Sequence, residues 1–354
     1  MDMLTGPLPS VDRIEFGKLF APTLVSAEFK AGKWSDLRYE PLHAFEMHPA
    51  AIVFHYGQAI FEGQKAFTRP GGEAALFRPE LNARRFRDSA ERMLLPVLPE
   101  ETFLQAVTEA TANNLSYVPP KPGSLYLRPT MIGHEPCIGV RGSNEALFFV
   151  LSVPAGAYFT NMRDGKGAIR VWVDKKVARA APGGTGGIKT SANYAGTLKS
   201  IHDAKQKGCA QVLYLDAQGT GHLEEMGGMN IFVVIGGKLV TPPLGGTILP
   251  GITRLSAIEA AHTLGIPVEE RPISIKEIVA AGKAGNLQEA FACGTAATIV
   301  GISEFVFEDE PSCVLPKPTG PIADQLLDYV QGVQYGTRPD THGWMRQVTS
   351  AVTV

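Results

Sequence analysis

Short apolar runs typical of β-strands alternate with amphipathic helical segments in the first half of this chain. Strands are predicted at 75–79, 124–133 and 146–153, and helices at 83–94 and 100–115, where apolar side chains recur at helical intervals. Strands bury alternate or continuous apolar faces and helices bury one stripe, so the two patterns together need layers of both kinds. The alternation therefore predicts an α/β domain.

A polar, glycine-containing stretch at 159–168 interrupts this pattern. With 354 residues, the chain is long enough for two domains of ordinary size. We therefore expect an N-terminal domain at 1–158, a linker at 159–168 and a C-terminal domain at 169–354.

The second half begins with a strand-like run at 169–174. A helix is predicted at 194–208, ending at Gly208, and buried strands follow at 211–216 and 229–235. The remaining predicted elements are hairpin turns at 217–221 and 236–238, a helix within 249–265, two strands within 289–302 and an amphipathic helix within 318–336.

The charge and the cysteine pattern exclude several classes of protein. Thirty-three basic and 35 acidic residues give a net charge of −2, so we expect no nucleic-acid partner and no attraction to an anionic membrane. The longest apolar runs are too short to cross a bilayer, and the N-terminus does not resemble a signal peptide, which predicts a cytoplasmic location. The four cysteines and eight histidines have no metal-ligand spacing, so we expect buried thiols and no metal.

Lys189 lies in the segment GGTGGIKTSANY, where glycines remove the neighbouring side chains. A lysine that forms a Schiff base with an aldehyde cofactor needs an unprotonated amine and room for a flat ring against the backbone. A lysine in a glycine-rich loop is more commonly a solvated loop residue. The segment alone therefore makes Lys189 a candidate for covalent cofactor binding.

Other segments contain the groups that a phosphorylated aldehyde cofactor requires. The N–H groups of Ile252 and Thr253, at a predicted helix start, can bind a phosphate, with Thr295 adding a hydroxyl and Arg85 a positive charge. Glu225 precedes glycines and an apolar strand, where a carboxylate can hold a proton on a ring nitrogen. Each of these residues also has an ordinary structural interpretation.

A nucleotide-binding loop is the alternative interpretation of the glycine-rich segment. A phosphate-binding P-loop requires G-x-x-x-x-G-K-[ST], but Ile188 separates Gly187 from Lys189. The G-x-G-x-x-G pattern also fails, because its last glycine falls on the lysine. A nucleotide-binding module is therefore the less favoured hypothesis.

Several segments together resemble the branched-chain amino acid aminotransferases, which belong to the class IV aminotransferases and to fold type IV of the pyridoxal phosphate enzymes. The segments are YGQAIFEGQKAF, SLYLRPTMIG, GGIKTSANYAGTLKS, LEEMGGMNIFV, LPGITR and FACGTAA. The resemblance runs from about residue 16 to about residue 345 in the same order. It implies a two-domain α/β (α+β) fold with a smaller N-terminal domain and a larger C-terminal domain containing a barrel-like sheet.

The resemblance implies a set of pyridoxal 5′-phosphate ligands. Lys189 would form the Schiff base, Tyr194 would hydrogen-bond the phenolic oxygen and Glu225 would pair with the ring nitrogen. The phosphate would be bound by Arg85, Ile252, Thr253 and Thr295, and Leu249 would pack on the ring.

The resemblance also implies a substrate site. Apolar walls would come from Phe20, Phe61, Tyr126 and Tyr158, and residues from the other subunit of a homodimer would be Tyr56, Ile138 and Val140. Arg128 would bind the second carboxylate of glutamate, and Gly228 and Ala296 would donate main-chain N–H groups to the α-carboxylate. Lys65 matches the longer branch of the family.

Two positions depart from the family pattern. Some members have threonine where this chain has Gly228, so only a backbone contact is implied there. Others have a C-x-x-C pair that falls here on Ala297 and Val300, which excludes redox control through that pair.

The implied activity is transamination between branched-chain L-amino acids and 2-oxoglutarate, with ping-pong kinetics and Lys189 as the base. Relatives with the same fold include D-amino acid aminotransferases and an aminodeoxychorismate lyase, and these remain alternatives. The motifs Tyr126-x-Arg128 and FEGQKAF favour the branched-chain reaction. One methylene changes binding by only about 1–3 kcal/mol, so the sequence does not rank leucine, isoleucine and valine.

Overall fold

The structure is a computed structural model that describes residues 2–4, 6–156, 167–317 and 319–348. The chain forms two compact units. The first comprises the described residues of Met1–Thr160, Lys189–Ala192 and Gly332–Val354, and the second those of Asn161–Ile188 and Asn193–Gln331. The chain therefore passes from one unit to the other several times.

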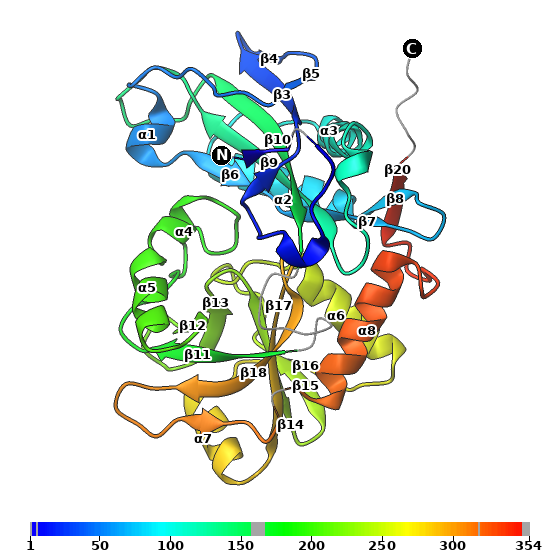
Figure 1. The fold of residues 1–354 in the computed structure, drawn as a ribbon. Helices are drawn as coiled ribbons and strands as arrows, with labels where there is room; N and C mark the ends of the chain where they lie inside the picture. The colour runs from blue at the N-terminus through cyan, green and yellow to red at the C-terminus, as the bar shows by residue number, and fades with distance from the viewer. Residues whose placement is uncertain (1, 5, 157–166, 318, 349–354) are drawn as a thin grey trace. The chain divides into compact units, whose positions relative to one another are not determined.

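The first unit is built on a nine-stranded sheet in which all the strand pairs are antiparallel (Figure 1). The strand order is β20-β8-β7-β9-β10-β3-β4, with β5 paired to β3 and β6 paired to β9. The strands of the unit are β1 (Asp2–Met3), β2 (Leu19–Phe20), β3 (Thr23–Lys30), β4 (Lys33–Trp34), β5 (Arg38–Pro41), β6 (Ala59–Phe61), β7 (Gln64–Thr68), β8 (Ala74–Phe77), β9 (Ser124–Gly133), β10 (Ala146–Ala155) and β20 (Met345–Val348). The helices are η1 (Val11–Arg13), α1 (Ile52–Tyr56), α2 (Pro79–Arg92), α3 (Glu100–Ala112) and η2 (Leu115–Tyr117).

Helices α2 and α3 pack together, and α3 also packs on strands β3, β9 and β10. Three aromatic rings fill this layer. The ring of Phe86 lies 5.1 Å from that of Phe103 and 5.6 Å from that of Phe148, and all three side chains are buried. Apolar burial of this kind is the main favourable contribution to folding, so this layer holds α2 against the sheet.

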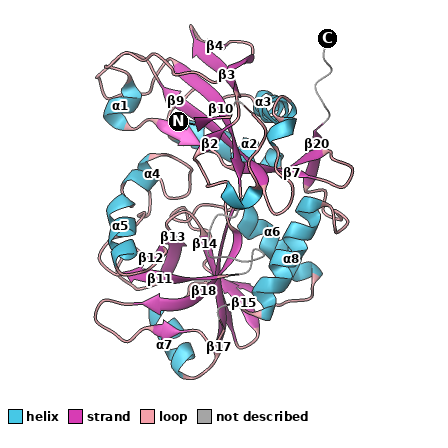
Figure 2. Cartoon of the chain, viewed as in Figure 1, coloured by secondary structure: helices cyan, strands magenta, loops and turns pink. Residues whose placement is uncertain are grey.

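The second unit contains a nine-stranded sheet with both parallel and antiparallel pairs (Figure 2). The strand order is β13-β12-β11-β18-β17-β14-β15-β16, with β19 paired to β18, and β11 is parallel to both of its neighbours. The strands are β11 (Ala168–Asp174), β12 (Gln211–Leu215), β13 (Leu223–Met226), β14 (Asn230–Ile235), β15 (Lys238–Thr241), β16 (Val268–Glu270), β17 (Leu287–Gly294), β18 (Thr298–Val306) and β19 (Cys313–Val314). The helices are α4 (Ala192–Ala195), α5 (Leu198–Gln206), α6 (Ile252–Thr263), α7 (Ile275–Lys283) and α8 (Pro321–Tyr335). Helix α4 begins, and α8 ends, on residues that belong to the first unit.

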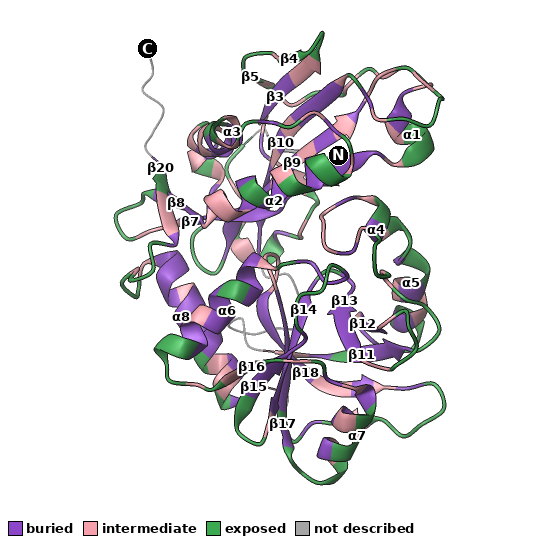
Figure 3. Ribbon diagram, turned by 180° about the vertical axis from the view of Figure 1, so that it is seen from behind, coloured by how far each residue is buried: buried purple, intermediate pink, exposed green. Residues whose placement is uncertain are grey.

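The strands at the centre of the second unit are buried (Figure 3). In the interior the rings of Phe232 on β14 and Phe291 on β17 stack 5.2 Å apart with an interplanar angle of 13°. Helix α5 packs on β11 and β12. A buried sheet of this kind provides fixed positions for the residues at its strand ends.

Most predicted elements are confirmed, and β9 has the predicted bounds, 124–133. The helix predicted at 194–208 is wrong as one element, because the chain leaves the helix between α4 and α5. Here the Thr197 hydroxyl donates to the carbonyl oxygen of Tyr194 at 2.8 Å, an alternative to helical bonding. The turn 217–221 does not connect the strands at 211–216 and 229–235 as expected; it leads from β12 into β13, a strand that the sequence analysis missed.

Two segments that we assigned to the C-terminal domain pack elsewhere. Residues 189–192 and the described residues after 331 belong to the first unit, where β20 pairs with β8. Backbone pairing with a distant strand decides their place, and no local pattern encodes that pairing. The expected boundary at residue 158 lies outside the described residues.

All four cysteines are free thiols, but only Cys209 and Cys293 are buried. The expectation of four buried thiols is therefore wrong for Cys137 and Cys313, which are partly exposed. Burial raises the pKa of Cys293 to about 12, so that this thiol stays protonated at neutral pH. None of the helices in the described part of the chain is both long and apolar enough to span a membrane.

Candidate active site

Lys189 is held in the first unit through its backbone. Its N–H donates to the Ser89 hydroxyl at 3.0 Å, and its carbonyl oxygen accepts from the N–H of Phe61 at 3.1 Å. The next residue, Thr190, forms a bridge with Ile60. These bonds attach the lysine segment to β6 and to α2, and the Lys189 amine lies 5.0 Å from the centre of the Phe61 ring.

Arg85 lies on the same helix as Ser89, one turn earlier, so that the two residues face the same way. Its guanidinium binds the Glu62 carboxylate with two bonds, Nε to Oε1 at 2.7 Å and Nη2 to Oε2 at 2.8 Å. The Asn82 amide donates to the same carboxylate at 2.7 Å. Glu62 is fully buried and Arg85 is 8% exposed, so each charge depends on the other.

Glu62 was missed by the sequence analysis, although it follows Phe61 directly in FEGQKAF. An acidic residue inside a run of buried strand residues was the available signal, since such a carboxylate needs a nearby cation. The first unit by itself therefore contains both the candidate Schiff-base lysine, Lys189, and the candidate phosphate-binding arginine, Arg85.

Several predicted substrate residues of the same unit are linked to one another, and one of them lies over the Phe61 ring. The Arg128 guanidinium lies 4.6 Å from the centre of that ring and donates to the Tyr126 hydroxyl at 3.0 Å. Phe20 packs against the group of apolar residues that contains Tyr126. A Cβ on Gly63 would lie 2.1 Å from the Tyr126 hydroxyl oxygen, so glycine is required there.

The other predicted residues of this unit lie on different parts of its surface or outside the described residues. Tyr56, on α1, donates a hydrogen bond to the carbonyl oxygen of Ile138. Ile138 and Val140 are 69% and 87% exposed. Tyr158 lies outside the described residues.

Glu225 is buried in the second unit, on β13. Its Oε2 accepts from the backbone N–H of Leu249 at 2.8 Å and from Arg179 Nη2 at 2.6 Å. The carbonyl oxygen of Leu249 in turn accepts from the Asn230 amide at 3.0 Å. This chain of bonds joins β13, β14 and the loop before α6 into one polar group inside the unit.

The predicted phosphate site follows immediately along the chain. Gly251 caps α6, and a Cβ there would lie 1.9 Å from Asn230 Oδ1. Ile252 and Thr253 are the first residues of the helix, where backbone N–H groups have no partner within the helix and the helix dipole favours an anion. The local geometry of a helix N-terminal anion site is therefore present.

The remaining predicted residues of the second unit lie near Gly228. A Cβ on Gly228 would lie 3.7 Å from the Tyr194 ring, so that ring borders the backbone at Gly228. A Cβ on Gly294, where the turn with Thr295 and Ala296 begins, would lie 3.4 Å from the Gly228 carbonyl oxygen. Two predicted N–H donors for a carboxylate, at Gly228 and Ala296, are thus on neighbouring segments.

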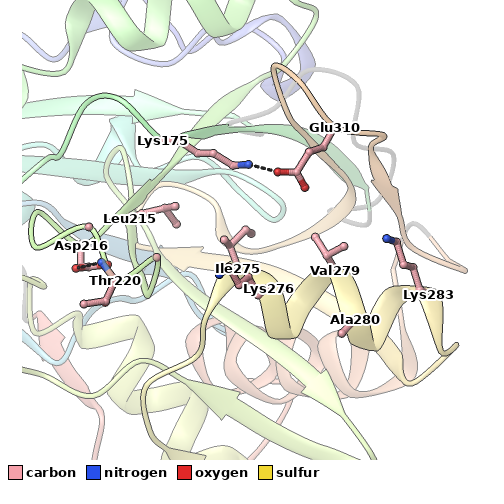
Figure 4. A pocket seen from close by; sticks show the side chains of 12 residues that line it. Lys175, Leu215, Asp216, Thr220, Ile275, Lys276, Val279, Ala280, Lys283 and Glu310 are labelled. Carbon is pink, nitrogen blue, oxygen red and sulfur yellow. Dashed lines mark hydrogen bonds and ion pairs between the residues drawn. The ribbon is translucent and has the colours of Figure 1, made fainter.

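A pocket of about 520 Å³ elsewhere in the second unit contains none of the predicted residues (Figure 4). Lys175 and Glu310 form an ion pair at one side of it. The Asp216 carboxylate accepts from the N–H groups of Gln218, Thr220 and His222, within its own turn. The anionic groups of this pocket are therefore engaged in local structure.

The Amino-transferase class IV family model matches residues 59–305 of the chain. The chain belongs to the class IV aminotransferases. It is 43% identical over 340 residues to the branched-chain-amino-acid aminotransferase of Mycolicibacterium smegmatis, covering 94% of this chain and 92% of that protein.

Solved structures of class IV aminotransferases confirm the predicted fold. A branched-chain aminotransferase from Thermoproteus uzoniensis, solved with norvaline, has a TM-score of 0.77 and 26% identity, over 92% of this chain and all of that one. The PLP form of the enzyme from Thermobaculum terrenum has a TM-score of 0.72 and 25% identity, over 92% and 98%. The mixed α/β fold expected from the resemblance is therefore that of this aminotransferase family.

We expect Glu62→Ala to lower the free energy of unfolding by about 3–5 kcal/mol, because it leaves the buried Arg85 charge without its partner. Urea unfolding of the full chain measures this loss. The control is Lys199→Ala, which breaks an ion pair whose side chains are 81% and 43% exposed and should cost less than about 1 kcal/mol. Equal losses in the two variants would contradict the prediction.

Lys65 is paired in register with Tyr126, and burial lowers its pKa to about 8 from 10.5. Between these values the folded chain binds fewer protons than the unfolded chain, so folding stability from this group increases as the pH rises. Relative to Lys65→Met, the wild type should gain about 3 kcal/mol of unfolding free energy between pH 8 and pH 10.5.

Urea unfolding across this pH range tests the prediction for Lys65. Lys30→Met is the control, since the Lys30 side chain is 69% exposed. The prediction fails if the wild type and Lys65→Met change in parallel with pH.

Proposed function

We propose that this chain catalyses pyridoxal 5′-phosphate-dependent transamination of branched-chain L-amino acids with 2-oxoglutarate, by a ping-pong mechanism. Membership of the class IV aminotransferases and the names of the relatives support this assignment. The observation that carries it is the shared attachment of Lys189 and Arg85 within the first unit. The Lys189 backbone is bonded to Ser89 of α2 and to Phe61, and Arg85, also on α2, is bonded to Glu62, the residue after Phe61.

The residues of the first unit fit one part of the cofactor. The amine of Lys189 is a primary amine beside an aromatic ring, suitable for covalent attachment to an aldehyde. Arg85 is held rigidly by Glu62, so it presents its charge without losing side-chain freedom on binding. In the proposed site it binds the phosphate.

The residues of the second unit fit the other parts of the cofactor. Glu225 would pair with the ring nitrogen, and Leu249, whose N–H is bonded to Glu225, would contact the ring. The phosphate would also receive N–H groups from the start of α6. The remaining proposed contacts are those of Tyr194 with the phenolic oxygen and of Thr295 with the phosphate.

When bound, the cofactor supplies an electron sink that makes the α-proton of the amino acid removable. Lys189 Nζ takes that proton as a general base and then returns it, as a general acid, to a carbon of the cofactor. Glu225 holds a proton at the ring nitrogen. Because the amino donor and the oxo-acid acceptor use the same site in turn, the kinetics are ping-pong.

The cluster around Phe61 accounts for binding both an aliphatic side chain and a carboxylate. Phe61, Tyr126 and Phe20 provide apolar walls, and Arg128 is fixed over Phe61 by its bond to Tyr126. Arg128 would bind the second carboxylate of glutamate, while Gly228 and Ala296 would donate N–H groups to the α-carboxylate. Tyr158 stays a prediction for the same wall.

D-amino acid transamination and aminodeoxychorismate lysis are the alternatives for this fold. The branched-chain reaction is favoured by the aromatic and arginine cluster and by the relatives. Family membership leaves no support for a nucleotide-binding module.

We also propose a homodimer. The side chains of Phe54, Tyr56, Ile138 and Val140 are exposed by 42% to 87%, on α1 and on the segment after β9. Exposed apolar side chains on neighbouring segments are typical of a protein interface, since a monomer would leave them in water. The backbone bridge between Ala51 and Pro136 holds these two segments together. A cytoplasmic location stays a prediction.

Visible absorbance of the purified chain tests the proposed reaction. With pyridoxal phosphate bound, we expect a yellow band that is lost on adding L-leucine and restored by 2-oxoglutarate, with no loss on adding D-alanine. Lys189→Ala should bind the cofactor without forming this band and should have no transaminase activity, because it lacks the covalent and proton-transferring amine. Normal turnover by Lys189→Ala, or loss of the band with D-alanine alone, would overturn the assignment.

Sedimentation velocity tests the dimer. Val140→Asp, at an 87% exposed position, should convert the dimer into a monomer because a charge would be buried in an apolar interface. Val314→Asp, at a 69% exposed position of the second unit, is the matched control and should leave the dimer intact. A wild-type monomer would refute the proposed assembly.

A further inference from the structure

Arg179 is a buried cation in the second unit that the proposed mechanism has not used. Its Nη2 donates to Glu225 Oε2 at 2.6 Å and to the carbonyl oxygens of Gly186 and Thr247, each at 2.9 Å. The Arg179 and Glu225 side chains are 4% and 3% exposed. A guanidinium stays protonated throughout the working pH range, so a permanent positive charge lies against the Glu225 carboxylate.

A second carboxylate, that of Glu224, also feels the charge of Arg179, but it has a different electrostatic environment from Glu225. Glu224 precedes Glu225 on β13, and burial raises the pKa of its carboxyl, an effect that Thr247 and Arg179 only partly oppose. No ion pair of Glu224 is present among the described residues, whereas Glu225 has a direct bond to Arg179. The direct ion pair therefore favours the charged form at Glu225, whereas burial raises the pKa of Glu224.

Other charged and titratable groups near this pair are Arg254, Cys293, Asp216 and the hydroxyl of Tyr214, whose pKa is raised by burial. Arg254 on α6 binds Glu270 and the carbonyl oxygen of Pro242, and the Cys293 thiol on β17 is kept protonated by burial. Asp216 lies near Glu224 and accepts bonds from its own turn. Arg179 is in direct contact with Glu225 through this ion pair.

We propose that Arg179 is a positioning residue that keeps Glu225 ionised, so that the proton shared between Glu225 and the cofactor rests on the cofactor's ring nitrogen. The inference deepens the proposed function and rests on it. A buried carboxylate without a cation takes up a proton, because desolvation penalises the charged form. Protonated Glu225 would donate to the ring nitrogen and leave the ring neutral, which makes it a poorer electron sink.

The experiment compares the full-length wild type with Arg179→Gln, Arg179→Lys, Glu225→Gln and the double variant Arg179→Gln/Glu225→Gln. The first readout is urea unfolding of the cofactor-free chain between pH 5 and pH 8. In Arg179→Gln the folded chain should hold an extra proton on Glu225, so its unfolding midpoint should fall with rising pH relative to the wild type. The fall should be absent from Arg179→Lys, which keeps the charge, and from the double variant, which has no carboxylate.

The second readout is the pH midpoint of the visible absorbance change of the cofactor-loaded chains. Arg179→Gln should raise that midpoint by about one pH unit, because it removes a cation and leaves the ring unprotonated. The same substitution in the Glu225→Gln background should have much less effect. This dependence on Glu225 separates positioning through the carboxylate from a general loss of structure.

The proposal is overturned if Arg179→Gln follows the wild-type pH dependence, or if its effects are the same with and without Glu225. It is also overturned if Arg179→Lys behaves like Arg179→Gln, since geometry and not charge would then be responsible. A wild type that binds no cofactor would defeat the proposed function and the ring-nitrogen role together. The unfolding data would then still show whether Arg179 controls the ionisation of Glu225.

Discussion

Burial of carboxylates beside arginines is the constraint on which the candidate site depends. Glu62 and Glu225 are both almost completely shielded from water, and each is bonded to an arginine of its own unit. Removing a charge from water costs several kcal/mol unless a partner compensates it. Each pair therefore fixes the geometry around it, Arg85 in one unit and the loop before α6 in the other.

Close approaches of the backbone are the second constraint. From the sequence alone, the glycines before Lys189 are expected to make room for a cofactor ring. A Cβ on Gly186 would lie 2.3 Å from the carbonyl oxygen of Thr247, so that this glycine allows two loops of the second unit to touch. Arg179 then bonds to the carbonyl groups of both residues. The motif thus serves the architecture of the unit as well as any ligand.

The local elements could be predicted from periodicity, and the long-range pairings could not. Strand β9 was predicted with its bounds because its largely apolar segment lies between Gly123 and Gly133. The break before α5 depends on the Thr197 hydroxyl, which a periodicity argument treats as an ordinary polar position. The roles of Glu62 and Arg179 could not be predicted from local sequence, because each depends on a distant ion-pair partner. Glu62 is 23 residues from Arg85, and Arg179 is 46 residues from Glu225. Residue patterns indicated Lys189, Glu225 and the phosphate ligands, the resemblance added Tyr194 and Leu249, and the structure showed the residues that hold them.

The order of the two units along the chain has a consequence for synthesis on the ribosome. The sheet of the first unit is completed by β20, which pairs with β8 although the two strands are far apart in the sequence. The segment of the first unit that carries Lys189 lies in the sequence between two stretches of the second unit and joins β6. The N-terminal strands must therefore wait until residues 345–348 have emerged before their sheet is complete. The open edge at β8 is exposed during that interval, so the nascent chain has a period in which edge-to-edge association competes with folding.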